Sequence, residues 1–501
     1  MQNKDSSISF NNWLHKEVFI KKLVSPAGIF ILVLFAVASG YLASIDLFFI
    51  PIAVAAALGG AIFVYVCLFK PYTGFYATSV FAVFVFYPNH LLGKDLIPLS
   101  VVLEMLLLFV FVGTYIAPNR QYEKTGKLMK SMITIMLIIN TLEAILQMFN
   151  PIARDFMVWM PHFKRWMVYM LVYVAAYRLL DTLPKIRYFF NFWVVLSFII
   201  ALYGCYQQWF GYLPSEYNYI LSVPGTFELL FQGGQLRKFS FLSDVVAFGI
   251  LAGTMALVTM LMAINEKNKK KKYMMFFGAL IMMLGMAYSG TRTTTVIIPA
   301  GVVMYGFLNI QSKQTLVILF STIMAVLFII FAPIYSNNTL NRVRSSFDSK
   351  DESLNLRERN RHLIQPYIYQ HPLGGGRGTT NGEGGLHFPG HPLANFPTDS
   401  ALLRIALETG WTGLVIWLLV NLAILWQGIH NFFRMKNKEM KMYMGIIICF
   451  MFPLIVTQYS QETIGQIPQG IFFFSLLSLI IRLKDLDDKY SESLTTEPIQ
   501  N

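Results

Sequence analysis

The sequence has 501 residues and a formal net charge of +13; 55% of its residues are hydrophobic, 13% are charged, and the mean hydropathy is +0.53. Because this apolar content exceeds what a soluble core needs and recurs in long runs, the composition excludes a soluble globular domain and predicts an all-α polytopic membrane protein. The basic charge does not indicate a nucleic-acid partner, because the lysines cluster in short loops beside apolar runs, where membrane topology places them.

Hydropathy predicts about 12–14 transmembrane helices with one long polar interruption. Two consecutive apolar runs follow the basic N-terminal segment, which indicates an uncleaved first span rather than a signal peptide. The expected spans are 27–45, 48–69, 72–88, 98–117, 128–149, 166–180, 188–210, 240–264, 273–289, 293–310, 315–335, 400–428, 442–458 and 465–482. Residues 1–335 are thus expected to hold the first eleven helices, residues 336–399 a large external loop, residues 400–482 the C-terminal helices and residues 483–501 a disordered cytoplasmic tail.

Basic residues in alternate loops predict which side of the membrane each loop faces. With a cytoplasmic N-terminus, the inside loops carry Lys70, Arg120, Lys124, Lys127, Lys185, Arg187, Lys267, Lys269–Lys272, Lys313, Arg434, Lys436, Lys438 and Lys441. The main exceptions are Lys164 and Arg165, which fall in an outside loop. Both termini are then cytoplasmic, and the loop 336–399 lies on the external, periplasmic face.

Ionisable residues gather at this predicted external face. They are Arg237, Asp244, Arg292, Arg357, Arg361, Arg377, His391, Asp399, Arg404 and Glu408. Charged groups near hydrocarbon are costly and usually line an aqueous or substrate site, so the set predicts a site within or beside the polar stretch Ser336–Thr412. Contact with lipid phosphates explains any single arginine equally well, and the prediction therefore rests on the whole set.

Arginine suits a diphosphate ligand, because its guanidinium stays charged and donates two parallel hydrogen bonds to phosphate oxygens. Arg357 and Arg361 have i, i+4 spacing and share a face of an expected helix, which Pro366 should kink or end. A surface amphipathic helix without a catalytic role is the alternative. Arg377 lies in the glycine-rich GGGRGTTNGEGG, which lacks the ending of a nucleotide-binding loop; a merely flexible loop is the alternative there.

Two residues are candidates for a general base that deprotonates an acceptor hydroxyl. His391 is the first choice, because the pKa of histidine lies near working pH, and Asp399 is the rival. Asp399 could instead cap the helix that follows it. His387 and His391 also have i, i+4 spacing, but Pro389 and Gly390 between them disfavour the helix that a metal site would need, so no metal is predicted.

Motif order adds a family resemblance. SGTR (289–292), RVRSSFD (342–348), NLRERN (355–360), HPLGGGRG (371–378) and TDSALLRIALETGWTGL (398–414) follow one another in the chain. This order, with an arginine shortly before a Pro-Leu-Gly-x-Gly turn and an ETGxxGL helix start after it, resembles the O-antigen ligase and polymerase superfamily of bacterial envelopes. The resemblance covers about residues 235–425.

The resemblance implies a many-helix fold of the lipid-sugar glycosyltransferase type in the bacterial inner membrane. It implies metal-independent, inverting transfer of a glycan from undecaprenyl diphosphate to an acceptor glycan or glycolipid, without a cofactor. Arg237, Arg292 and Arg357 match donor-diphosphate positions, and Arg361 and Arg377 are further candidates. Ligases of the family usually carry a His-Asn pair before the final helix.

Asp399-Ser400 stands in the place of that pair and favours an O-antigen or exopolysaccharide polymerase, with a chain-length regulator as a candidate partner. A ligase that acts on the lipid A-core of lipopolysaccharide is the first alternative. A flippase or transporter of lipid-linked oligosaccharides is the alternative of another class, because the predicted span count also fits such a protein.

Overall fold

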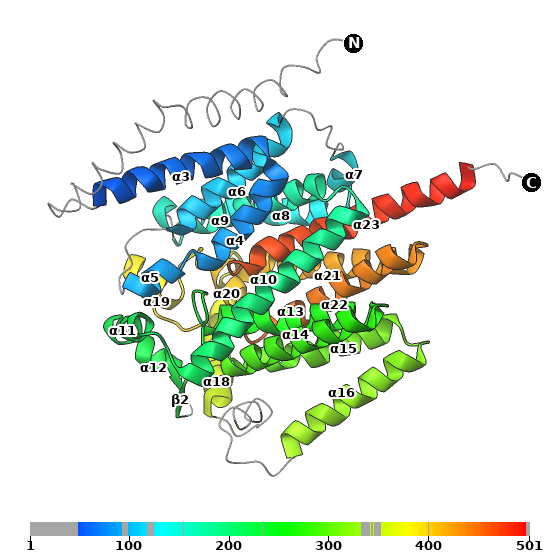
Figure 1. Cartoon of the computed structure of the whole chain (residues 1–501). Coiled ribbons are helices and arrows are strands. Elements are labelled where there is room, and N and C mark those ends of the chain that lie inside the picture. Colours follow the sequence, from blue (N-terminus) through cyan, green and yellow to red (C-terminus); the bar gives the residue numbers. More distant parts are fainter. Residues whose placement is uncertain are drawn as a thin grey trace, which may run out of the picture. The chain divides into compact units, whose positions relative to one another are not determined.

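The computed structural model describes residues 49–92, 99–117, 125–153, 155–232, 234–331, 341, 344, 352–398 and 400–496. These residues are mostly helical, as predicted, with one short antiparallel hairpin (Figure 1). The elements are α3 (Phe49–Phe69), α4 (Pro71–Phe84), α5 (Tyr87–Leu92), α6 (Leu99–Ile116), α7 (Gly126–Met129), α8 (Met132–Leu146), η2 (Gln147–Phe149), α9 (Phe156–Leu179), α10 (Leu183–Phe210), α11 (Pro214–Ser222), α12 (Thr226–Leu230), β1 (Phe231–Gln232), β2 (Gln235–Leu236), α13 (Val245–Asn265), α14 (Lys269–Tyr288), η3 (Arg292–Val296), α15 (Ile297–Leu308), α16 (Lys313–Phe331), α18 (Glu352–Gln370), α19 (Asn381–His387), α20 (Ala401–Glu408), α21 (Gly410–Arg434), α22 (Lys438–Thr457) and α23 (Gln469–Thr496).

The described residues include 7 helical stretches that are long and apolar enough to cross a membrane. They are Pro71–Leu92, Leu99–Ile116, Met132–Phe149, Leu183–Phe210, Val245–Asn265, Gly410–Arg434 and Lys438–Thr457, and shorter apolar helices occur at Val54–Phe69, Arg292–Leu308 and Thr315–Ala325. The prediction of an all-α polytopic membrane protein is confirmed. The first expected span, 27–45, lies outside the described residues.

The chain divides into two compact units, the first of which comprises residues 1–78 and 105–123. In its described part, small residues let α3, α4 and α6 approach closely. A Cβ atom at Gly74 would lie 2.7 Å from the Cα of Cys67, and one at Gly113 would lie 2.3 Å from the carbonyl oxygen of Cys67. Such close backbone approach is the usual way in which membrane helices pack without a hydrophobic driving force.

The second unit, residues 79–104 and 124–501, has α13 at its centre. The α13 helix begins at its N-cap Asp244, whose carboxylate accepts from the backbone N–H groups of Val246 and Ala247 at 2.7 and 2.9 Å. It is apolar all round, and α10, α14, α15 and α22 pack against it. A second group, formed by α8, α9, α21 and α23, joins this core through α22. A helix whose surroundings are apolar on every side, from protein or from lipid, reads as uniformly apolar, and the burial of α13 among its neighbours accounts for its sequence.

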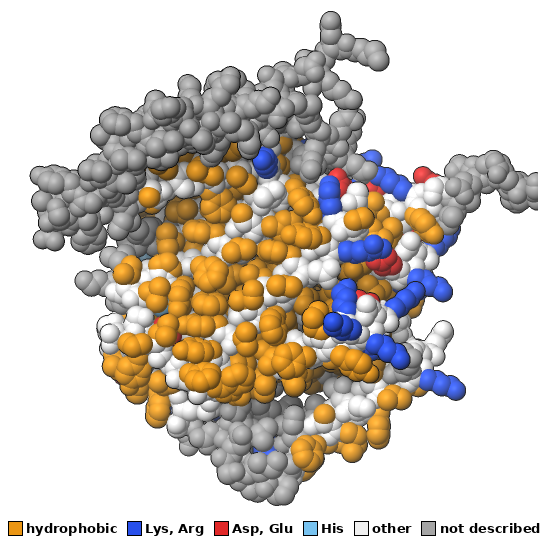
Figure 2. Space-filling model, in the orientation of Figure 1, with side chains coloured by type: hydrophobic (Ala, Val, Ile, Leu, Met, Phe, Trp, Pro, Cys, Tyr) orange, Lys and Arg blue, Asp and Glu red, His pale blue; other side chains and the backbone are white. Residues whose placement is uncertain are grey.

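Basic residues gather at one end of the second unit, beside a broad apolar surface (Figure 2). Lys267 lies between α13 and α14, and Lys269–Lys272 form the first turn of α14; Arg434 ends α21, and Lys436 lies between α21 and α22. Arg187 at the start of α10 forms an ion pair with Glu439 of α22, which brings those helix ends together. These loops are the ones that the charge rule assigns to the cytoplasm; the side of the membrane that they face stays a prediction.

The observed helices differ from the expected bounds in two places. Residues 483–496, expected to belong to a disordered tail, are helical, because α23 continues to Thr496. Its fully buried Arg482 donates to the carbonyl oxygen of Tyr177 at 2.8 and 3.1 Å, and the buried Asp487 accepts from the backbone N–H groups of Lys436 and Asn437. The polar composition that suggested disorder instead serves these buried contacts.

The second difference concerns the span expected at 400–428, which the structure divides into two helices, α20 and α21, separated at Thr409. In α18, Pro366 lies inside the helix, which therefore does not end there.

Candidate active site

A cavity of about 470 Å³ lies in the second unit. Its walls include α8, α9, the residues before α13, the segment after α18, α20, α21 and the segment between α22 and α23. Charged and amide side chains share the lining with aromatic rings, including those of Trp166 and Trp417. Asp244 at the start of α13 and Thr409 at the start of α21 also line it, so the cavity lies at the opposite end of these two helices from the basic loops.

One face of α9 supplies a wall of the cavity. His162, Arg165, Trp166 and Tyr169 follow at i, i+3, i+4 and i+7, the spacing that puts residues on one side of a helix. Arg165 is exposed and makes no hydrogen bond or ion pair with any residue that the structure describes. Arg165 is one of the two basic residues that the charge rule did not explain, because it falls in a loop expected to face outside. Its position in the cavity wall gives a reason for a cation on that face.

Glycines join the HPLGGGRG segment to the break between α20 and α21. The backbone N–H groups of Gly375 and Gly376 donate to the carbonyl oxygens of Leu407 and Glu408 at 2.8 and 2.9 Å. Gly410 has a φ of +72°, and a Cβ atom there would lie 1.9 Å from the carbonyl oxygen of Pro372. Glycine is therefore required at residue 410 both for its backbone conformation and for the space it leaves.

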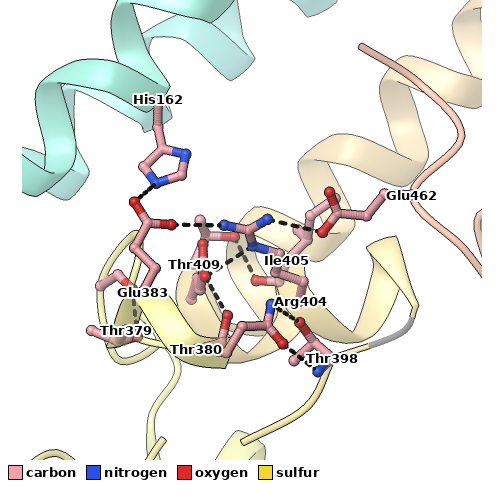
Figure 3. Close-up of polar contacts among 12 residues, drawn as sticks. His162, Thr379, Thr380, Glu383, Thr398, Arg404, Ile405, Thr409 and Glu462 are labelled. Atoms are coloured by element: carbon pink, nitrogen blue, oxygen red, sulfur yellow. Dashed lines mark hydrogen bonds and ion pairs between the residues drawn. The ribbon is translucent and has the colours of Figure 1, made fainter. Parts of the chain in front are cut away.

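Arg404 is the centre of an ion-pair network in the cavity wall (Figure 3). Its Nε donates to Glu408 at 3.0 Å, its Nη1 to Glu462 at 2.9 Å, and its Nη2 lies 3.5 Å from Glu383. Glu408 also accepts from the Thr380 hydroxyl at 2.5 Å. Three carboxylates thus hold one guanidinium, which fixes the relative positions of α19, α20 and the segment after α22.

Arg377 forms a second ion pair, with Glu143 of α8, at 3.1 Å. The Nε of Arg377 and the Oε1 of Glu143 are buried and have no hydrogen-bond partner among the described residues. Buried polar atoms are normally paired, so these two atoms are candidates for contact with a ligand in the cavity.

His162 and Glu383 form a third pair, with 3.0 Å between Nε2 and Oε1. Burial raises the pKa of Glu383, but the hydrogen bond with His162 and the nearby charge of Arg404 outweigh it and hold this pKa below its usual value. Gly378, with a φ of +76°, lies against the pair: a Cβ atom there would meet Val158 at 2.4 Å and His162 Nε2 at 3.3 Å. The glycine lets the Arg377 segment pass close to α9.

A family model matches part of the chain that carries this site. Residues 277–418 match the O-antigen ligase family model. The matched region runs from within α14 into α21 and includes Arg377, Arg404 and Glu408. The match confirms the resemblance to the O-antigen ligase and polymerase superfamily and supports a membrane enzyme with glycosyltransferase-like activity. A comparison with curated proteins found no match.

The predicted arginines fall into different surroundings. Arg377 lines the cavity and lies within the matched residues 277–418. Arg237 does not; it is buried, and its Nε and Nη2 donate to the Ser289 carbonyl oxygen and the Thr291 hydroxyl at 2.9 Å each. Arg292 begins η3 directly after this turn, so the two arginines that were expected at one membrane face belong to neighbouring segments. Binding of diphosphate by either residue stays a prediction.

Arg357 and Arg361 share the helix α18, as predicted. Arg361 donates to the carbonyl oxygen of Tyr459 at 2.7 Å, and its guanidinium lies 4.0 Å from the centre of the Tyr459 ring. The side chain of Arg357 lies outside the description, as does all of Asp399. The capping role considered for Asp399 belongs to Ser400, whose hydroxyl accepts from the backbone N–H of Leu403 at 3.3 Å.

His391 does not line the cavity. Its Nδ1 accepts from the backbone N–H of Leu393 at 3.1 Å, and its buried Nε2 has no partner among the described residues. A neutral ring with Nδ1 as acceptor carries its proton on Nε2 and has no free lone pair for a hydroxyl proton. Burial and the charge of His371 also lower the pKa of His391. The geometry favours a packing role, and its assignment as the base stays a prediction.

Sequence reasoning missed the cavity wall formed by α8 and α9. Glu143 lies within an expected span, where an acidic residue is costly enough to indicate function, and that signal could have found it. The sequence around His162 gave no such signal, because this residue lies before an expected span and not within one. Its ion pair with Glu383 joins residues that are far apart in the chain.

Proposed function

We propose that the chain transfers a glycan from undecaprenyl diphosphate to an acceptor sugar hydroxyl in this cavity. The cavity would open to the periplasmic face of a bacterial inner membrane, with both termini cytoplasmic. The observation that carries the proposal is the convergence of Arg165, Arg377 and Arg404 with tryptophans and carboxylates in one cavity, beside the family-matched region.

The sugar next to the diphosphate is assigned to the aromatic and acidic part of the cavity. Trp166 and Trp417 lie edge to face with 6.1 Å between ring centres, and Trp417 Nε1 donates to Gln458 at 2.5 Å. Tryptophan offers an apolar face together with a polar edge, which suits the mixed surface of a sugar. The free Oε1 of Glu143 can accept from a sugar hydroxyl.

The diphosphate is assigned to Arg165 and Arg377. Three carboxylates already surround Arg404, so we assign it the role of holding the wall in place. Arg165 has no acidic partner among the described residues, and Arg377 has one partner and a free Nε. Guanidinium groups bind phosphate oxygens bidentately and stay charged at any relevant pH. The predicted arginines outside the cavity remain the competing assignment.

In the proposed reaction the acceptor oxygen attacks the anomeric carbon from the face opposite the diphosphate. The bond between that carbon and the phosphate oxygen breaks, and its electron pair leaves with the lipid diphosphate. Arg165 and Arg377 stabilise the negative charge that develops there, without a metal. One displacement inverts the anomeric configuration. Asp399-Ser400 in place of a His-Asn pair favours a glycan acceptor, as in a polymerase, over lipid A-core.

The test uses purified protein in lipid nanodiscs with an undecaprenyl-diphosphate-linked oligosaccharide. Wild-type protein should lengthen the lipid-linked glycan and release undecaprenyl diphosphate. Arg165→Ala should lower the rate roughly 100-fold, a typical effect of removing one group that stabilises transition-state charge. Arg434→Ala is the matched control, because it removes an exposed arginine at the far end of α21.

The outcomes separate the alternatives. Wild-type protein that moves the glycan across a bilayer without joining it to an acceptor would be a transporter. Wild-type transfer that Arg165→Ala leaves unchanged would move the diphosphate site out of this cavity.

A further inference from the structure

We propose that His162 is the general base of the transfer and that Glu383 positions its ring. This inference rests on the proposed glycosyl transfer and assigns the proton, which the arginines cannot accept. It also replaces both base candidates that the sequence suggested.

His162 has the right position. It lines the cavity one turn before Arg165 on the same face of α9. Side chains at i and i+3 lie roughly 5–6 Å apart at their Cβ atoms. A base and a phosphate-binding arginine at this separation can serve the two sides of one reacting sugar, because the attacking hydroxyl and the leaving diphosphate flank its anomeric carbon.

Glu383 also sets which nitrogen can accept a proton. Its lowered pKa makes it a carboxylate at neutral pH, and a carboxylate only accepts hydrogen bonds. Nε2 of His162, 3.0 Å away, must therefore carry a proton, and the lone pair of the neutral ring lies on Nδ1. Nδ1 points away from Glu383 (Figure 3) and makes no hydrogen bond with a described residue. His391 has the reverse arrangement, with Nδ1 already occupied by Leu393.

The surroundings of the pair hold it in place. The second oxygen of Glu383 faces Arg404 at 3.5 Å, and Arg404 is itself held by Glu408 and Glu462. If the His162–Glu383 pair only held α9 against α19, a hydrogen bond would be enough. A base also needs a free nitrogen in the cavity and an anion that stabilises the charged ring, and His162 has both.

The acceptor O–H gives its proton to His162 Nδ1 as its oxygen forms the new bond to the anomeric carbon. The old bond to the diphosphate breaks with its electron pair. His162 becomes an imidazolium that Glu383 stabilises, and its proton passes to water after the products leave.

The experiment uses the full-length protein and the transfer assay above. His162→Gln keeps an amide N–H that can bond to Glu383 but has no basic nitrogen, so kcat should fall roughly 100-fold with KM for the lipid donor little changed. His162→Ala should fall equally and regain activity when free imidazole is added. Glu383→Gln should lose kcat without rescue by imidazole. His387→Ala, an exposed histidine at the end of the same α19, is the matched control and should keep full activity.

The possible results are distinct. Wild-type protein without transfer would overturn the proposed function itself. Wild-type transfer with an active His162→Gln variant would show that His162 is only a tether. Loss in His162→Ala that imidazole does not restore, or loss in His391→Ala that imidazole restores, would place the base elsewhere.

Discussion

Loss of Arg404 should destabilise the second unit strongly, because it leaves a buried carboxylate without its cation. The Arg404 side chain is 22% exposed and that of Glu408 only 7%. In Arg404→Met, Glu408 would keep the Thr380 hydroxyl as its hydrogen-bond donor but would lose the guanidinium 3.0 Å away. Breaking a buried pair by removing one partner costs roughly 3–5 kcal/mol. The more exposed partners, Glu383 and Glu462 at 35% and 39%, add little.

A double-mutant cycle in detergent tests this magnitude. Guanidinium titration of wild type, Arg404→Met, Glu408→Gln and the double variant gives each free energy of unfolding. The double variant should be more stable than the sum of the single effects predicts, by roughly 1–3 kcal/mol, because it buries no unpaired charge. Arg187→Met, which removes an exposed pair with Glu439, should cost less than about 1 kcal/mol. An Arg404 effect as small as this control, with no coupling, would refute the reasoning.

Three further changes follow from particular contacts. Gly410→Ala should lower the free energy of unfolding by at least about 1–3 kcal/mol, because residue 410 has a left-handed φ of +72°, and it should also abolish transfer. Gly382→Ala should leave both unchanged, because the space around Gly382 is open. Thermal unfolding and the transfer assay compare the two variants. Asp487→Ala should lower the free energy of unfolding by roughly 1–3 kcal/mol, because it leaves two backbone N–H groups without acceptors. The Asp488 side chain is 49% exposed, so Asp488→Ala should not change the unfolding midpoint. The pKa of Glu383 is lowered in the folded protein, so its carboxylate stabilises the fold at pH values above the usual pKa of 4.5, and this stabilisation is lost as the pH falls through the folded-state pKa. The difference in unfolding midpoint between wild type and Glu383→Ala should therefore shrink under acid. A difference that stays constant with pH would contradict this.

The fold class was predictable because membrane helices must satisfy their own backbone, which makes apolar runs reliable signals. Hydropathy missed the break at Thr409, because α20 and α21 both contain many apolar residues and average into one apolar run across Gly410. It also misjudged the tail, where Asp487 looked like a residue of a disordered segment but is buried against the α21–α22 loop. Local composition does not report which polar groups find partners far away in the chain.

The site was half predictable. Arg377 was found because its motif is continuous in sequence, and the glycines around it reflect close packing against α20 and α21. Arg165 and Glu143 were not assigned, although each stood out as a charge in an unexpected place. Their meaning depends on α8 and α9 reaching the family-matched region, which no local pattern encodes.

The central claim is that the donor diphosphate binds in the cavity. The most direct measurement is an experimental structure of the protein in nanodiscs with a non-hydrolysable undecaprenyl-diphosphate sugar analogue. We predict phosphate density in contact with the guanidinium groups of Arg165 and Arg377, and the sugar beside Trp166 and Trp417. Phosphate density at Arg237 and Arg292, with none in the cavity, would contradict the account.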